Sequence, residues 1–166
     1  KRDVQPNYTN ISIMGSFVTL AAGMRLNNKD FFEYGKQRLK KLHDYNVKNG
    51  SFSEFNSPTY TFVAIRELTS ITDYIQDEDC VGWVNTLLDM AWYTVAVHYH
   101  PTTGQLTGPH FRAYSYLIGA GTKFLIERGT NYRVILLSDK ERLAAAESFG
   151  YDTLFPRISC PDHLLP

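Results

Sequence analysis

The clearest indication of the fold is the segment EDCVGWVNTLLDMAWYTVAVHY, residues 78–99. Its apolar side chains recur every three or four residues, the spacing that places them on one face of an α-helix. They are Val81, Trp83, Val84, Leu87, Leu88, Ala91, Trp92 and Val95. Upstream, residues 11–26, a segment from Asp30 and a segment from Ser57 to Tyr74 show similar patterns. We therefore predict a mainly α fold.

The ends of these upstream helices follow from capping residues. Asp30, with Glu33 three residues later, has the spacing of a capping box and predicts the start of the second helix. Ser57 predicts an N-cap for the third helix, with Pro58 in its first turn. In residues 11–26 we expect a buried helix whose inward side chains are Ile13, Met14, Phe17, Val18, Ala21 and Met24.

Downstream, the pattern predicts a fifth helix from Tyr114 to Arg128 and leaves residues 133–137 open between helix and strand. Ser138 with Glu141 predicts a capping box for a last helix that Gly150 ends. For the tail, residues 151–166, we predict irregular structure. We assign residues 1–130 to a helical-hairpin region and residues 131–166 to a short helix and tail of the same domain.

Short and long connections between the helices alternate along the chain. Helical hairpins with long loops at one end are typical of helical repeats and of α/α toroids. We therefore predict helical hairpins as in part of an α/α toroid. Since the chain starts at Lys1 without a signal peptide, we expect a processed, truncated or engineered start, and a longer parent chain that completes the cleft.

Charge and composition exclude several classes of partner. The 166 residues carry a formal net charge of +0, and the sequence pI is about 7.1, so we expect neither nucleic acid nor a membrane as partner. The two cysteines, Cys80 and Cys160, are open between one bridge and two free thiols.

The first long loop contains a candidate sugar site. Glu54 and Asn56 are two residues apart, so in an extended segment they point the same way, and Phe52 shares that side. A carboxylate and an amide beside an aromatic ring are suited to hold a sugar, and we assign Tyr60 to the same site. The alternative is that Asn56 and Ser57 satisfy the start of the next helix.

The second long loop offers a more specific set. His110, Arg112, Tyr114 and Tyr116 alternate, so all four share one face if the segment is extended. If a helix starts near Ala113, only the first two keep that relation. An imidazole can act as a base, a phenol as an acid and a guanidinium as a carboxylate clamp. The alternative is a loop held by structural hydrogen bonds.

Metal and cofactor chemistry receive little support. Three imidazoles, those of His98, His100 and His110, could bind zinc, but no cysteine or carboxylate lies at a spacing that would complete such a site. We assign His100 to substrate binding and predict no metal and no cofactor. Glycoside hydrolysis needs two carboxyl groups facing one bond, and Glu54 supplies only one, which favours a lyase over a hydrolase.

Three segments, residues 5–11, 54–60 and 108–116, resemble a group of secreted bacterial and fungal proteins of largely uncharacterised function, with the likeness spanning roughly residues 5–127. Their layout is similar to that of α/α-toroid carbohydrate-active enzymes, including heparinase-like and alginate-lyase-like polysaccharide lyases. The resemblance implies His110 or Tyr114 as base or acid, and Arg112 or Asn56 as neutraliser of the substrate carboxylate. This chain lacks the paired-Asn signature of some of those lyases and is shorter than a full toroid.

These observations lead to one expectation with two alternatives. We expect a secreted or periplasmic lyase that cleaves a uronate-containing polysaccharide or oligosaccharide by β-elimination, using His110, Arg112, Tyr114 and Glu54. The first alternative is a glycoside hydrolase on the same scaffold that depends on Glu54. The second is a non-catalytic helical scaffold that binds a glycan or protein partner through its long loops.

Overall fold

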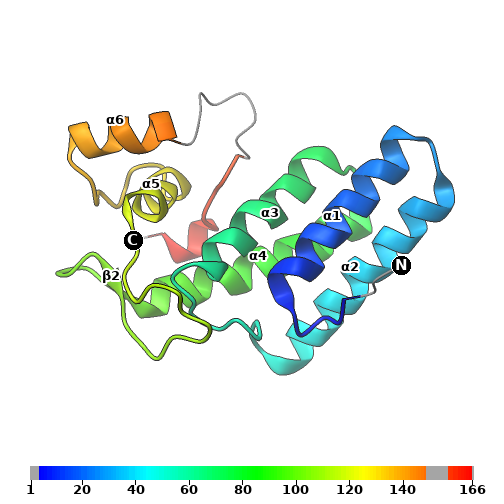
Figure 1. The fold of residues 1–166 in the computed structure, drawn as a ribbon, viewed down its shortest axis with the longest axis horizontal. Helices are drawn as coiled ribbons and strands as arrows, with labels where there is room; N and C mark the ends of the chain where they lie inside the picture. The colour runs from blue at the N-terminus through cyan, green and yellow to red at the C-terminus, as the bar shows by residue number, and fades with distance from the viewer. Residues whose placement is uncertain (1–3, 149–156, 166) are drawn as a thin grey trace.

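The computed structural model describes residues 4–148 and 157–165, which form a mainly α-helical fold (Figure 1). Four helices make two hairpins, α1 (Thr9–Arg25) with α2 (Lys29–Asn49) and α3 (Tyr60–Tyr74) with α4 (Glu78–His98). Helix α1 packs on α2 and α3, and α4 packs on the same two helices. The predicted mainly α fold with helical hairpins is confirmed.

Smaller elements follow the second hairpin. β1 (Tyr99–His100) and β2 (Gln105–Leu106) pair antiparallel, with Tyr99 opposite Leu106. α5 (Ala120–Gly129) packs on α6 (Asp139–Ser148), and the short 3-10 helix η1 (Asp162–Leu164) lies on α4. None of the helices in the described part of the chain is long and apolar enough to cross a membrane.

The core lies between the four long helices, where apolar positions of α2, α3 and α4 meet as their spacing predicts. Leu39, Leu68 and Leu87 are fully buried there. Cys80 and Cys160 are both buried and both free, which answers the question that the sequence left open. Burial raises the pKa of the Cys80 thiol to about 12, so this thiol is unreactive at neutral pH.

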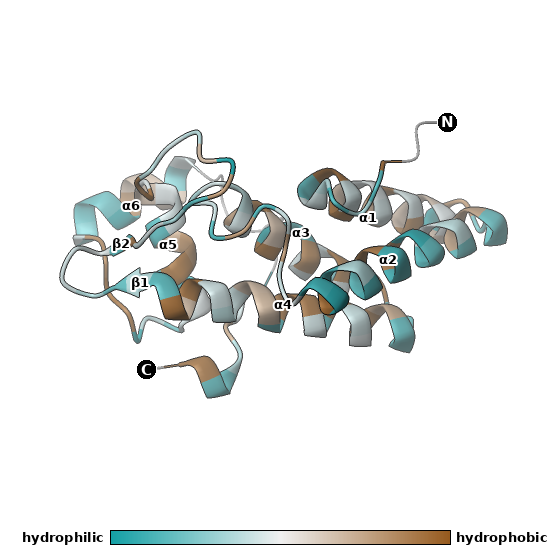
Figure 2. Ribbon diagram, turned by 90° about the horizontal axis from the view of Figure 1, so that it is seen from below, coloured by the Kyte–Doolittle hydropathy of each residue, from teal (hydrophilic) through white to brown (hydrophobic). Residues whose placement is uncertain are grey.

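Helix α1 forms as predicted and Ile13 is fully buried, but three of the other apolar side chains expected inside are not. Four polar side chains of α1 are buried, while Met14, Val18 and Met24 are exposed; the buried ones are Thr9, Asn10, Ser12 and Ser16. The reason is the close approach of α2, since a Cβ added at Gly23 would lie 2.5 Å from the Phe32 nitrogen. Such a contact admits only small side chains, so larger apolar side chains such as Met14 and Val18 lie outside it. Figure 2 shows α1 beside α2, with the ribbon coloured by hydropathy.

Two helix starts also differ from the sequence-based expectation. α2 is capped by Asn28, whose side chain accepts a hydrogen bond from Phe31 N at 3.0 Å, and Asp30 lies inside the first turn. α5 starts at Ala120 instead of Tyr114. The Ser115 hydroxyl bonds the backbone of Leu117, and such local bonds compete with helix formation.

The remaining boundaries agree more closely with expectation. α3 starts at Tyr60 with Thr59 as its N-cap, two residues later than predicted, although Ser57 Oγ still accepts from Tyr60 N at 3.0 Å. Ser138 with Glu141 forms the predicted capping box. Residues 133–137 are neither helix nor strand, because Glu127 Oε1 accepts the N–H groups of Leu136 and Leu137. Gly150, the predicted end of the last helix, lies outside the described residues.

Candidate functional site

The two long loops, which are remote in sequence, are joined by hydrogen bonds. Asn56 Nδ2 donates to Thr107 O at 2.7 Å and to Pro109 O at 3.0 Å. Phe111 N donates to Phe55 O at 3.0 Å. Asn56 is 1% exposed and adopts φ +48°, a left-handed conformation that asparagine tolerates better than most residues. Asn56 therefore holds the second loop, and both of its N–H donors are occupied.

Glu54 joins this contact to the start of α1. Its side chain is 4% exposed, and Oε1 accepts a hydrogen bond from Arg112 Nη1 while Oε2 accepts from Asn10 N at 3.0 Å. Asn10 lies in the first turn of α1, where the helix dipole favours a negative charge. The carboxylate is thus paired at both oxygens, and it ties three separate segments together.

Arg112 is held between two tyrosine rings. Its guanidinium carbon lies 4.7 Å from the ring centre of Tyr8 and 4.8 Å from that of Tyr60. Its Nη2 also donates to Tyr8 Oη at 3.1 Å. Hydrogen bonds to Tyr114 and to Tyr8 raise the pKa of Arg112 above its ordinary value. Arg112 is therefore a fixed cation, oriented by ring faces and by the Glu54 carboxylate.

Two phenols meet beside this cation with opposite electrostatic environments. The rings of Tyr60 and Tyr114 make an edge contact with centres 5.8 Å apart. Burial, followed by the hydrogen bond with Tyr114, raises the pKa of Tyr60. Hydrogen bonds to Arg112 and then to Tyr60 lower the pKa of Tyr114, whose side chain is 75% exposed. Tyr114 is therefore the more acidic phenol and the one that solvent reaches.

His110 lies on the same loop, two residues before Arg112, and its ring orientation is defined by one contact with the first loop. Its Nδ1 lies 2.8 Å from Asn56 O, and since a carbonyl only accepts, Nδ1 is the protonated nitrogen of the neutral ring. Nε2 then keeps its lone pair, which is the form that a general base requires. We call Tyr8, Glu54, Tyr60, His110, Arg112 and Tyr114 the loop cluster.

Besides Asn56, which holds the second loop, three of the residues assigned from sequence lie outside the loop cluster. Phe52 is 6% exposed and belongs to the hydrophobic core. His100 lies in the β1–β2 hairpin, where Nδ1 is 3.2 Å from Thr103 Oγ1. Tyr116 is 75% exposed and makes no hydrogen bond or ring contact with any other residue that the structure describes.

Tyr8 is the member of the loop cluster that sequence patterns did not single out. It precedes α1 and has no periodic relation to either loop. The segment of residues 5–11, which carries part of the resemblance, was the available signal. Among the described residues, no three His, Cys, Asp or Glu side chains gather where they could hold a metal ion.

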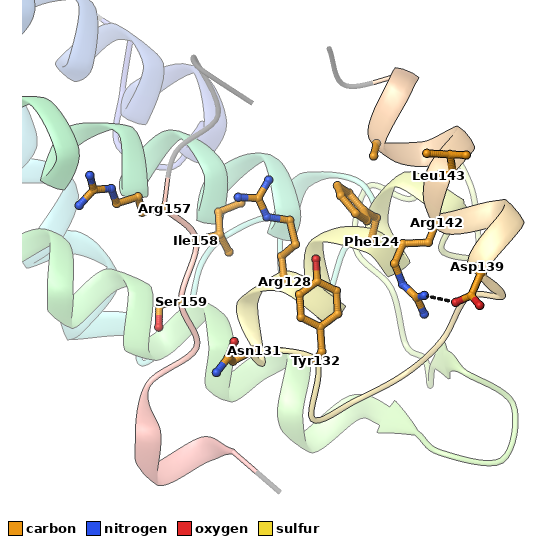
Figure 3. Close-up of a pocket in the computed structure, with 11 residues that line it drawn as sticks. Phe124, Arg128, Asn131, Tyr132, Asp139, Arg142, Leu143, Arg157, Ile158 and Ser159 are labelled. Carbon is orange, nitrogen blue, oxygen red and sulfur yellow. Dashed lines mark hydrogen bonds and ion pairs between the residues drawn. The ribbon is translucent and has the colours of Figure 1, made fainter. Parts of the chain in front are cut away.

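A cavity of about 790 Å³ lies elsewhere, between α5, α6 and residues 157–159 (Figure 3). Arg142 lines it, but its guanidinium pairs with Asp139 at 2.7 Å and with the fully buried Glu127 at 2.7 Å. No residue of the loop cluster lines this cavity. The cavity and the loop cluster are therefore separate features.

Comparisons with known proteins give a family and no activity. No curated protein matches the chain, and no solved structure matches it. A family model described as "Domain of unknown function (DUF8769)" matches residues 1–123, which include both hairpins and the whole loop cluster. The chain belongs to the DUF8769 family.

Proposed function

We propose that the loop cluster binds an acidic glycan and cleaves it by β-elimination beside a uronate residue. The observation that carries this proposal is the exposed phenol of Tyr114, made more acidic by Arg112, on the same loop as His110, whose Nδ1 is held by Asn56 O. Elimination needs one group that takes a proton and another that gives one, and titratable groups with different environments suit these two tasks.

The reaction assigns one bond change to each group. His110 Nε2 removes the proton from the carbon next to the substrate carboxylate, and that electron pair forms a carbon–carbon double bond. The bond between the neighbouring carbon and the glycosidic oxygen breaks, and Tyr114 protonates the leaving oxygen. Transfer of the proton from His110 back to Tyr114 through water restores both groups. The products are one unsaturated chain end and one new hydroxyl group.

The other members of the loop cluster position these two groups. Arg112 lowers the pKa of Tyr114, and Glu54 and the rings of Tyr8 and Tyr60 hold Arg112 in place. Because Glu54 already balances the charge of Arg112, we propose that Arg112 acts on Tyr114 and is not the group that neutralises the substrate carboxylate. Asn56 cannot take this role, since both of its N–H donors are engaged by the second loop.

The same contacts weigh against glycoside hydrolysis. A hydrolase would use Glu54 as an acid, a base or a nucleophile. Glu54 is 4% exposed and paired at both oxygens, so proton transfer to a sugar would first break the ion pair with Arg112. Since uronate polymers of the expected kind are cell-surface or secreted materials, we also propose a secreted or periplasmic location.

The test is incubation of the chain, and of any longer parent protein, with a panel of polyuronates. Ultraviolet absorbance of the unsaturated product should rise, and His110→Ala and Tyr114→Phe should each reduce the rate at least 100-fold, the usual size of general acid–base contributions. Tyr116→Phe is the matched control, since Tyr116 is equally exposed but outside the loop cluster. A rate unaffected by the first two substitutions would contradict the assignment.

One observation favours a second candidate function. Arg112 and Glu54 neutralise each other within a network that joins three segments, which also suits a rigid, non-catalytic glycan-binding surface. This candidate predicts uronate binding that Tyr114→Ala weakens, with neither unsaturated product nor new reducing ends. New reducing ends without ultraviolet absorbance would instead indicate hydrolysis.

A further inference from the structure

Helix α1 carries an apolar surface that no described element covers. Between Thr9 and Met24 the helix has no charged residue, and its large side chains recur at spacings of three and four residues on the outward side. We define the α1 face by these outward side chains and by the ring of α3 that adjoins them: Met14, Phe17, Val18, Ala21, Met24 and Tyr74. In Figure 2, α1 forms an outer edge of the helical layer.

Helix α1 differs from an ordinary surface helix because it has apolar side chains on both sides, with Ile13 and Leu20 fully buried. Its side toward α2 buries Ser12 and Ser16, while Val18 is 64% exposed and Met24 48% exposed. These two hydroxyls are hydrogen-bonded, since Ser12 Oγ donates to Gln5 O at 2.9 Å and Ser16 Oγ donates to Ser12 O at 2.8 Å. A surface helix normally turns its apolar stripe toward the core and its polar residues toward water. An outward apolar stripe is therefore the mark of a surface that packs against something else.

The α1 face also contains a hollow that can receive a side chain. Phe17 and Tyr74 meet with ring centres 6.0 Å apart at one side of it. The hollow measures about 550 Å³ and is lined by Phe17, Ala21, Met24, Arg25, Tyr74 and Ile75. In knobs-into-holes packing between helices, outward side chains at helical spacing act as knobs and a hollow of this kind acts as the hole.

We propose that the α1 face is a self-association surface and that its partner is a second copy of this chain. The contact is a two-fold symmetric, antiparallel pairing of α1 with the partner's α1. With the axis near Thr19, Met14 lies against the hollow beside the partner's Met24, and Val18 lies close to the partner's Val18. Each copy thus supplies both the knob and the hole, as a two-fold interface requires.

Charge favours a second copy over a charged partner. A two-fold contact brings charges near the axis against their own copies, and this helix has none between Thr9 and Met24. Arg25 is the first charge beyond that stretch, and at a rise of about 1.5 Å per residue the two copies of Arg25 lie about 18 Å apart. That separation exceeds the roughly 8 Å screening length at physiological salt, so their repulsion is small.

The size of the surface is compatible with a stable but not obligate dimer. Met14, Val18, Met24 and Tyr74 are between 39% and 64% exposed. With large side chains of roughly 200 Å² each, these four offer about 400 Å² per copy. The partly buried Phe17 and Ala21 bring the α1 face to on the order of 500 Å². Two copies would bury about 1,000 Å², the lower limit for a specific interface. We therefore expect association at micromolar concentrations.

The experiment is sedimentation velocity of the chain over a concentration series. The wild-type chain should shift from monomer to dimer, and Val18→Lys, which places two ammonium groups near the axis, should raise the dissociation constant at least 30-fold. Val97→Lys is the matched control, because Val97 is also an exposed helical valine, 53% exposed on α4, outside the α1 face. It should leave the dissociation constant within about 2-fold of wild type, as expected of an independent surface site.

Charge pairing gives a second readout that a folding defect would not mimic. An equal mixture of Val18→Lys and Val18→Glu chains should form a heterodimer, while each variant alone stays monomeric. The proposal is overturned if the wild-type chain is monomeric at the highest concentration reached. It is also overturned if Val18→Lys leaves the dimer intact or if Val97→Lys disrupts it equally. Turnover of polyuronates has no bearing on any of these results.

Discussion

Replacement of Glu54 by glutamine tests whether the loop cluster is held together by its buried carboxylate. Glu54 is 4% exposed, and it accepts hydrogen bonds from Arg112 and from Asn10 N. Glutamine keeps the shape and one acceptor oxygen, so the bond from Asn10 N can survive, whereas the ion pair is lost. Since Arg112 retains 30% exposure and water can solvate it, the loss approximates one hydrogen bond to a charged group, about 2 kcal/mol.

The assay is thermal and urea unfolding of the wild-type and variant chains. For a chain of 166 residues, about 2 kcal/mol corresponds to a fall in Tm of roughly 4–8 °C. Glu67→Gln is the matched control, because Glu67 pairs with the adjacent Arg66 on a partly exposed surface, where an ion pair contributes at most about 1 kcal/mol. The reasoning is refuted if Glu54→Gln destabilises the chain no more than Glu67→Gln does.

Three further outcomes are expected. Asn56→Ala removes both hydrogen bonds to the second loop, so it should lower the free energy of unfolding by about 2–3 kcal/mol and speed amide exchange in residues 107–112. Unchanged exchange would mean that Asn56 does not hold the second loop. Burial raises the pKa of Glu127, but hydrogen bonds from Arg142 and from two backbone N–H groups outweigh this and hold it below 4.5. Glu127→Gln should therefore lower the free energy of unfolding, measured with urea, by about 3–5 kcal/mol at neutral pH. The difference from wild type should shrink as the pH falls below about 4, and a difference that does not change with pH would contradict the ion pair. Arg112→Gln should raise the pKa of Tyr114 toward 10 in a phenolate absorbance titration, and no change would mean that the guanidinium does not set it.

The four long helices could be predicted because each shows apolar residues at helical spacing. The orientation of α1 could not be predicted, because its apolar residues lie on more than one side. The side that is buried is determined by the close contact between α1 and α2 at Gly23 and Gly35. A pattern of hydrophobicity does not report that small residues allow two backbones to approach. Packing, and not periodicity, therefore placed Met14 and Val18 outside.

The candidate site was predicted in part. Glu54, Arg112 and Tyr114 come together, as do Asn56 and His110, because the two loops are hydrogen-bonded to each other. Tyr116 was expected on the same face, but Arg112 adopts φ +52°, so the extended alternation on which that prediction depended stops there.

Tyr8 joins the loop cluster only through the tertiary contact of the α1 start with Arg112. A contact between residues more than a hundred positions apart leaves no local periodic signal. The same holds for the Asn10 N–H group that binds Glu54, because it is a backbone donor that any residue at that position would supply. Sequence spacing could therefore predict the loop residues but not the segment that closes the cluster.

We propose above that the loop cluster is where this protein binds an acidic glycan. Titration of a uronate oligosaccharide into isotope-labelled chain, followed by amide chemical shifts, tests it most directly. We predict saturable shifts concentrated in residues 54–60 and 107–116 and near Tyr8, which Tyr114→Ala weakens. Shifts confined to the cavity between α5 and α6, or no saturable shifts at all, would contradict the account.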